Sequence, residues 1–173
     1  MNEPILQTLA KIAITLAGFS GLVVTIRFRG THAWSTTELR FLWLLIGDSF
    51  LVLFFSLLPF PMVLAGWSQA TVWGLCSALL GSWFIVGNLL ALLGERRDRA
   101  AKRLVTVPVI TPVLYSMFVI ALLMGIALWL SAWNLFVPRG QAVYVLGLMV
   151  LLAFAVVEFL FFIGLMSKRN EDR

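Results

Sequence analysis

Apolar residues occur in five long runs, separated by short stretches in which charged residues, proline or glycine collect. About 20 apolar residues are enough to cross a bilayer as a helix, so each run predicts a transmembrane helix. The predicted spans are residues 5–26, 39–58, 71–94, 105–133 and 142–166. The expected fold class is therefore all-α: an integral membrane protein with a single bundle of five transmembrane helices, forming one domain over residues 1–173.

Prolines and a capping pattern predict how two of these spans begin and end. Ser35 and Glu38 have the spacing of a capping box, which predicts a helix start at the second span. The two prolines of the stretch SLLPFP remove backbone donors, so we expect the second helix to stop there. Pro108 and Pro112 open the fourth span, and we expect them to bend its first turns unless neighbouring groups satisfy the freed carbonyls.

The basic residues predict an orientation. Eleven of the 13 lysines and arginines fall in the first connection, the third connection and the C-terminal tail. Cytoplasmic connections carry an excess of Lys and Arg, so we expect the N-terminus outside and the C-terminus inside. This pattern needs an odd number of spans, which supports counting the first span although Gln7 and Lys11 interrupt it. Residues expected to contact lipid headgroups at the inner face are Arg96, Arg97, Arg99, Lys102 and Arg103.

Composition agrees with a membrane protein and argues against other classes. The chain is 61% hydrophobic and 12% charged, and a soluble domain would carry about twice that charged fraction. The net charge of +5 is accounted for by the connections, so we expect no nucleic acid partner. One cysteine and one histidine leave no disulfide, no Cys-based metal site and no set of partnered catalytic groups. We therefore expect no cofactor, no metal and no enzymatic activity, and the acidic start MNEP predicts no cleavable signal peptide.

Polar side chains within the spans are the candidates for function. Counted from the basic side, Asp48, Asn88 and Thr111 lie about 12 Å deep and Glu158 about 15 Å deep, with Tyr115 one turn deeper than Thr111. Four spans thus place a polar group at one level. An acid at a helix centre costs about 2.5–3.5 kcal/mol on insertion scales, and such acids commonly mark ion paths. If the two acids are close, they share one proton; a protonated acid can also be held structurally, by hydrogen bonds to the other polar groups.

The first span carries two faces. Gln7, Lys11 and Thr15 share a polar stripe, which we expect to face protein or water rather than lipid. Lys11 can extend its ammonium to the headgroups or, if the helix tilts, pair with one of the acids. Small residues expected at helix contacts are Ala13, Ala17 and Gly21 of the first span and Gly74 and Gly81 of the third.

Two functions follow from these patterns. The first is an ion- or proton-conducting membrane protein, a homo-oligomeric channel for H⁺ or a monovalent cation. Its pore would be lined at a symmetry axis by the polar stripe of the first span or by a ring of the intramembrane acids. Its expected path residues are Asp48, Glu158, Asn88, Tyr115, Lys11, Gln7 and Thr15. The alternative is a non-catalytic membrane interaction module, such as an assembly factor, sensor or effector subunit, acting through helix–helix contacts.

Both functions place the chain in contact with membrane lipids, as a multi-pass protein of the cell membrane. The stretches ITLAGFSGLVVTIRFRG and LFFSLLPF resemble those of small bacterial membrane proteins, a resemblance that implies no particular activity. The expected location is the bacterial inner membrane.

Overall fold

The computed structural model describes residues 3–28, 36–100, 110–135 and 140–171, and side chains over most of these ranges. The described residues form six α-helices and no strand. The helices are α1 (Glu3–Phe28), α2 (Thr36–Leu57), α3 (Pro59–Leu64), α4 (Gln69–Ala100), α5 (Ile110–Ala132) and α6 (Gln141–Glu171). Five apolar segments are long enough to cross a membrane, one of them formed by α2 and α3 together. The prediction of an all-helical chain with five potential spans is confirmed.

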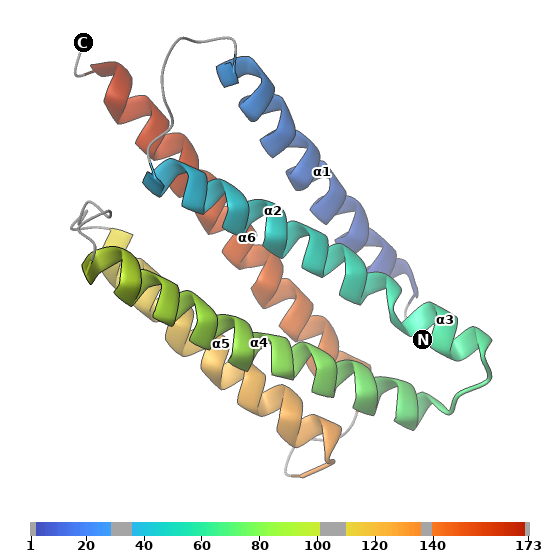
Figure 1. Cartoon of the computed structure of the whole chain (residues 1–173). Coiled ribbons are helices and arrows are strands. Elements are labelled where there is room, and N and C mark those ends of the chain that lie inside the picture. Colours follow the sequence, from blue (N-terminus) through green and yellow to red (C-terminus); the bar gives the residue numbers. More distant parts are fainter. Residues whose placement is uncertain (1–2, 29–35, 101–109, 136–139, 172–173) are drawn as a thin grey trace.

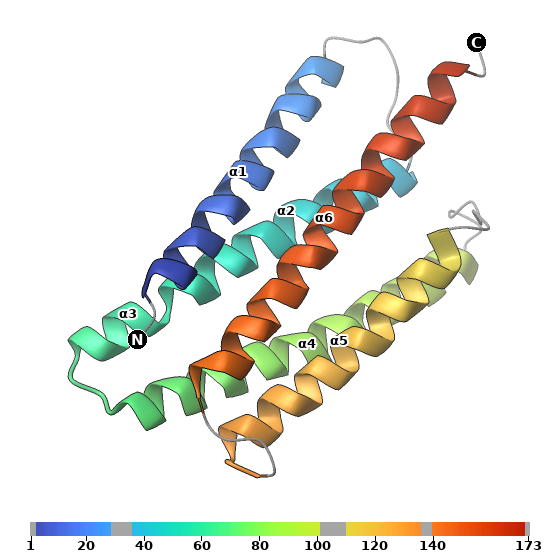
Figure 2. The same ribbon diagram turned by 180° about the vertical axis from the view of Figure 1, so that it is seen from behind.

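The long helices pack as a group of three and a group of two. Helices α1, α2 and α6 lie side by side, and α4 packs along α5 (Figure 1). Helix α6 contacts each of the other four long helices and thus joins the two groups (Figure 2). Helix α1 begins and α6 ends at opposite ends of the bundle. We call the end that carries Arg40, Arg96 and Arg97 the basic end, and the opposite end, with Trp67 and Trp133, the tryptophan end.

The outside of this bundle is largely apolar. Large hydrophobic side chains more than half exposed include Phe19 and Leu22 of α1, Phe50 and Phe54 of α2, Leu89 and Leu90 of α4, Val119 and Leu123 of α5, and Leu146 and Leu160 of α6. A soluble monomer rarely exposes apolar patches beyond a few hundred Å², so a surface of this kind is suited to lipid rather than to water.

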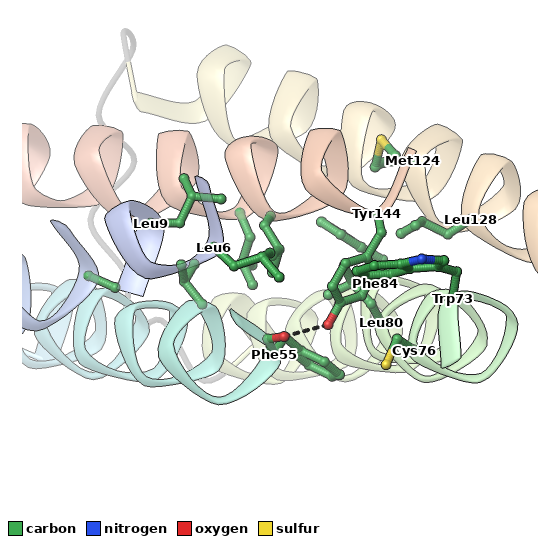
Figure 3. Packing of buried hydrophobic residues seen from close by; sticks show 14 of the residues in the cluster. Leu6, Leu9, Phe55, Trp73, Cys76, Leu80, Phe84, Met124, Leu128 and Tyr144 are labelled. Atoms are coloured by element: carbon green, nitrogen blue, oxygen red, sulfur yellow. Dashed lines mark hydrogen bonds between the residues drawn. The ribbon is translucent and has the colours of Figure 1, made fainter. Parts of the chain in front are cut away.

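Pro59 interrupts the second span without ending it. Proline has no N–H, so the carbonyl of Phe55, four residues earlier, loses its helical donor. Tyr144 of α6 supplies the replacement, because its hydroxyl donates to this carbonyl at 2.6 Å within the buried core (Figure 3). Helix α2 ends at Leu57 and α3 continues the apolar segment to Leu64, whereas the sequence predicted an end at Leu58.

The start of α5 borders residues that the structure does not describe. The described part of this helix begins at Ile110, two residues before Pro112. Pro108 lies outside the described residues, as does Ser35 of the predicted capping box. The bend expected from the two prolines therefore stays a prediction.

Two glycines allow α4 and α5 to approach closely. A Cβ atom on Gly81 would lie 3.0 Å from the carbonyl oxygen of Gly125, 3.0 Å from the Trp129 ring and 3.1 Å from Cβ of Leu128. The backbone oxygen and the Cβ atom cannot move without moving helix α5. Gly81 therefore lies at a helix contact, as the sequence predicted. Any side chain larger than the glycine hydrogen would displace α5.

We expect Gly81→Leu to lower the thermal midpoint of unfolding in detergent. Overpacking a tight contact costs about 1–3 kcal/mol, which exceeds the gain of about 0.5–1 kcal/mol from removing a glycine from a helix. Gly164→Leu on α6 is the matched control, since a Cβ there meets nothing within 4 Å. An equal fall in both variants would contradict the assigned contact.

Candidate functional site

Asp48 lies on α2 and Glu158 on α6, two helices that pack against each other. The two acids are close enough for the charge of Asp48 to act on Glu158. The side chain of Glu158 is only 4% exposed, and that of Asp48 is half-buried. Glu158 therefore lies inside the bundle, whereas part of Asp48 remains exposed.

One carboxylate oxygen of this pair lacks a hydrogen bond. Within the described part of the chain, Oε2 of Glu158 is buried and has no hydrogen-bond partner. An isolated ionised carboxylate is costly to bury, and two adjacent carboxylates repel if both ionise. The buried oxygen of Glu158 could accept a hydrogen bond from a further donor, such as water.

Aromatic contacts lie on both sides of the acid pair along the bundle. Phe154, one turn before Glu158 on α6, meets Phe84 of α4 with ring centroids 6.4 Å apart. Phe161, about one turn after Glu158, meets Phe41 of α2 with centroids 5.7 Å apart. The polar level is thus bounded by apolar side chains in both directions.

Buried apolar side chains form a layer on each side of the acids. One layer runs from Phe84 toward the tryptophan end and includes Leu80, Tyr144 and Trp73 (Figure 3). Toward the basic end, the buried apolar side chains among the described residues are Phe41, Leu42 and Phe162.

Arg40 links α2 to α4 near the basic end. Its Nη2 atom donates to the carbonyl of Ala91 at 3.3 Å, and the contact is partly buried. From the sequence, Arg40 was one of the eleven basic residues that predict the orientation, and its contact with α4 was not predicted. The signal for this contact is that Arg40 lies just inside the predicted start of the second span, where a long side chain can reach a neighbouring helix.

The other polar residues that were expected at the depth of the acids lie on α4 and α5. Asn88 donates its amide nitrogen to the carbonyl of Phe118 at 2.8 Å. Tyr115 is nearly half exposed, and its ring lies against that of Phe118. The side chain of Thr111 lies outside the described set. The two acids therefore lie on the packed helices α2 and α6. Asn88 does not join them, because its side chain connects α4 to α5.

The polar stripe of α1 lies on its outer side. Gln7, Lys11 and Thr15 are all exposed, and the hydroxyl of Thr15 donates to the carbonyl of Lys11 at 2.8 Å. The side of α1 that packs against the bundle carries Leu6 and Ala13, both fully buried. Lys11 therefore lies on the face of α1 that is turned away from the interior in which the acids lie.

The small residues differ in their surroundings. Ala13 is fully buried, whereas Ala17 and Gly74 are half-buried. Gly21 is exposed, and a Cβ there would meet nothing within 4 Å. Within this chain, the predicted small face of α1 is therefore in contact at Ala13 and open at Gly21.

The charged end of α4 is only partly described. Arg96 and Arg97 are exposed near the end of the helix. The side chains of Arg99, Lys102 and Arg103 lie outside the described set. Arg96 and Arg97 are therefore on the surface of the basic end, which is a position from which they could contact lipid headgroups.

Within the described residues, no group of three or more His, Cys, Asp or Glu side chains could hold a metal ion. Cys76 is fully buried, with its thiol 3.7 Å from the sulfur of Met62. A scan against protein-family models and searches of curated proteins and of solved structures found no match to this chain.

Proposed function

We propose that this chain is a multi-pass membrane protein that conducts protons or monovalent cations, with the Asp48–Glu158 pair as the group that binds and releases the ion. The observation that carries the proposal is the placement of two acids midway along the packed apolar helices α2 and α6, with a buried oxygen of Glu158 that lacks a hydrogen bond within the described chain. Intramembrane acids are costly and commonly mark ion or proton paths.

Membrane insertion is supported by two independent features. Five segments have the length and hydropathy of spans, and their outer surfaces expose large apolar side chains. The basic end, which carries Arg40, Arg96 and Arg97, is proposed to face the cytoplasm, because cytoplasmic connections are enriched in Lys and Arg. The N-terminus is then outside and the C-terminus inside, in the cell membrane and specifically the bacterial inner membrane.

The position of the acids favours a path through each chain. A ring of acids around a shared symmetry axis would need them on the outer surface of the bundle, and Glu158 is 4% exposed inside it. Water that reaches the pair from the basic end passes the layer of Phe41, Leu42 and Phe162 and could hydrogen-bond to the acids. Release toward the tryptophan end requires the layer that includes Leu80 and Tyr144 to open.

The test is ion flux into liposomes that contain the purified protein. We expect proton or potassium flux above that of empty liposomes, measured across imposed pH gradients and voltages. Absence of flux under all of these conditions would contradict conduction. It would favour the alternative of a non-catalytic membrane interaction module, for which the outward polar face of α1 is the specific supporting observation.

A further inference from the structure

Glu158 is the more enclosed of the two intramembrane acids. Its side chain is 4% exposed, and its Oε2 atom is buried without a hydrogen-bond partner in the part of the chain that the structure describes. Ala155 and Phe162, about one turn before and one turn after it on α6, are both fully buried. An ionised carboxylate is costly in such surroundings, because neither water nor enough donors compensate its charge.

Charged groups are few on the described helices that contact α6. On α2, Asp48 bears on Glu158 with a like charge, whereas Glu38 and Arg40 lie in the first two turns, and Arg40 donates to a carbonyl of α4 there. On α1, Lys11 is exposed on the outer side. The candidate spans of α4 and α5 contain no charged residue. An ionised Glu158 would therefore meet a like charge and apolar side chains, so its neutral form is favoured.

The surroundings of the acids offer few ligands for a metal cation. A dehydrated cation needs several oxygen atoms in place of its hydration shell. Within one turn of either acid along α2 or α6, the only other side-chain oxygen is that of Ser49, whose hydroxyl donates to the carbonyl of Leu45 at 2.8 Å. In transporters, unwound backbone carbonyls coordinate Na⁺, whereas α2 and α6 are continuous helices at this depth. A proton, by contrast, needs a single oxygen.

A cation that kept its hydration shell would meet the aromatic contacts on both sides of the acids. The rings of Phe84 and Phe154 lie 6.4 Å apart on one side, and those of Phe41 and Phe161 lie 5.7 Å apart on the other. A hydrated cation is wider than a single file of water and would have to separate the helices at both contacts. Protons move along acid side chains and hydrogen-bonded water, which need less space.

We propose that the ion conducted by this protein is the proton, and that Glu158 binds it as a neutral acid. This inference rests on the proposed conduction and narrows it to one ion. A proton that arrives along water forms an O–H bond at a carboxylate oxygen of Glu158. The same bond breaks when water on the other side accepts the proton, which returns the carboxylate.

Ion selectivity in planar bilayers that contain the purified protein tests the proposal. We expect the reversal potential to move by about 59 mV for each tenfold change in the proton gradient, the value for one charge. It should not move when a K⁺ or Na⁺ gradient is imposed at equal pH. A reversal potential that follows K⁺ or Na⁺ would overturn the proton assignment and leave conduction standing. Absence of any current would overturn conduction itself, and the proton assignment with it.

Infrared spectroscopy tests the neutral acid without any measurement of transport. We expect the carbonyl stretch of a protonated carboxyl group at neutral pH in the wild type and in Glu3→Gln, the same change at an exposed acid. The band should be lost in Glu158→Gln. Its absence from the wild type, or its persistence in Glu158→Gln, would overturn the assignment of the proton to Glu158.

Ser49→Ala separates proton binding from coordination of a metal cation. The hydroxyl of Ser49 donates within its own helix, and the carbonyl of Leu45 keeps its helical N–H donor when that hydroxyl is removed. We therefore expect unchanged proton flux and unchanged selectivity in this variant. A tenfold loss of flux at equal incorporation would mark Ser49 as an oxygen ligand of the ion and overturn the proposal.

Discussion

Asp48→Asn is expected to reduce proton or cation flux at least tenfold while leaving the fold as stable as that of the wild type. The amide matches the shape of the acid and cannot exchange a proton in the working pH range. Removing an ionisable group from a buried site also removes the free-energy cost of burying its charge. Function and stability therefore respond in opposite ways if the pair binds and releases the ion.

Glu158→Gln should have the same effect, since the two acids act on each other inside one bundle. The matched control is Glu3→Gln, the same chemical change at an exposed acid in the first turn of α1. Flux into liposomes is measured at equal protein incorporation for the three variants. Flux that persists in both Asp48→Asn and Glu158→Gln would remove the pair from the ion path.

Tyr144→Phe is expected to lower the free energy of unfolding by about 1–3 kcal/mol, the usual cost of leaving a buried polar group unsatisfied. The group left without its donor is the carbonyl of Phe55, which has no helical donor because residue 59 is proline. The substitution removes only an oxygen, so the packing of the ring against Trp73 is kept. Unfolding in detergent, followed by temperature or denaturant, measures the effect.

A double-mutant cycle with Pro59→Ala isolates this contact. Alanine restores an N–H four residues after Phe55, so that carbonyl regains a donor within its own helix. In the Pro59→Ala background, Tyr144→Phe should therefore cost less than it does in the wild type. A coupling energy near zero would show that the hydroxyl does not replace the missing helical bond.

The five potential spans and their approximate limits could be predicted from the sequence alone. A helix in lipid satisfies its own backbone groups, so length and hydropathy decide whether a segment can span, largely without reference to its neighbours. The predicted end of the second span was wrong at a proline. Pro59 is followed by a further helix, and the hydroxyl of Tyr144 donates to the carbonyl of Phe55 that the proline leaves without a helical donor.

The sequence also determined which residues of each helix are polar, but not what those residues meet. It placed Asp48, Glu158 and Asn88 at one depth. In the tertiary structure the two acids lie on the packed helices α2 and α6, whereas Asn88 hydrogen-bonds to α5. The polar stripe of Gln7, Lys11 and Thr15 could also be identified from the sequence, but only the structure showed that it lies on the outer side of α1. The reason is that apolar helices gain little from exchanging lipid for one another. Close packing at small residues and single hydrogen bonds, formed between segments far apart in the chain, therefore decide which helices pair.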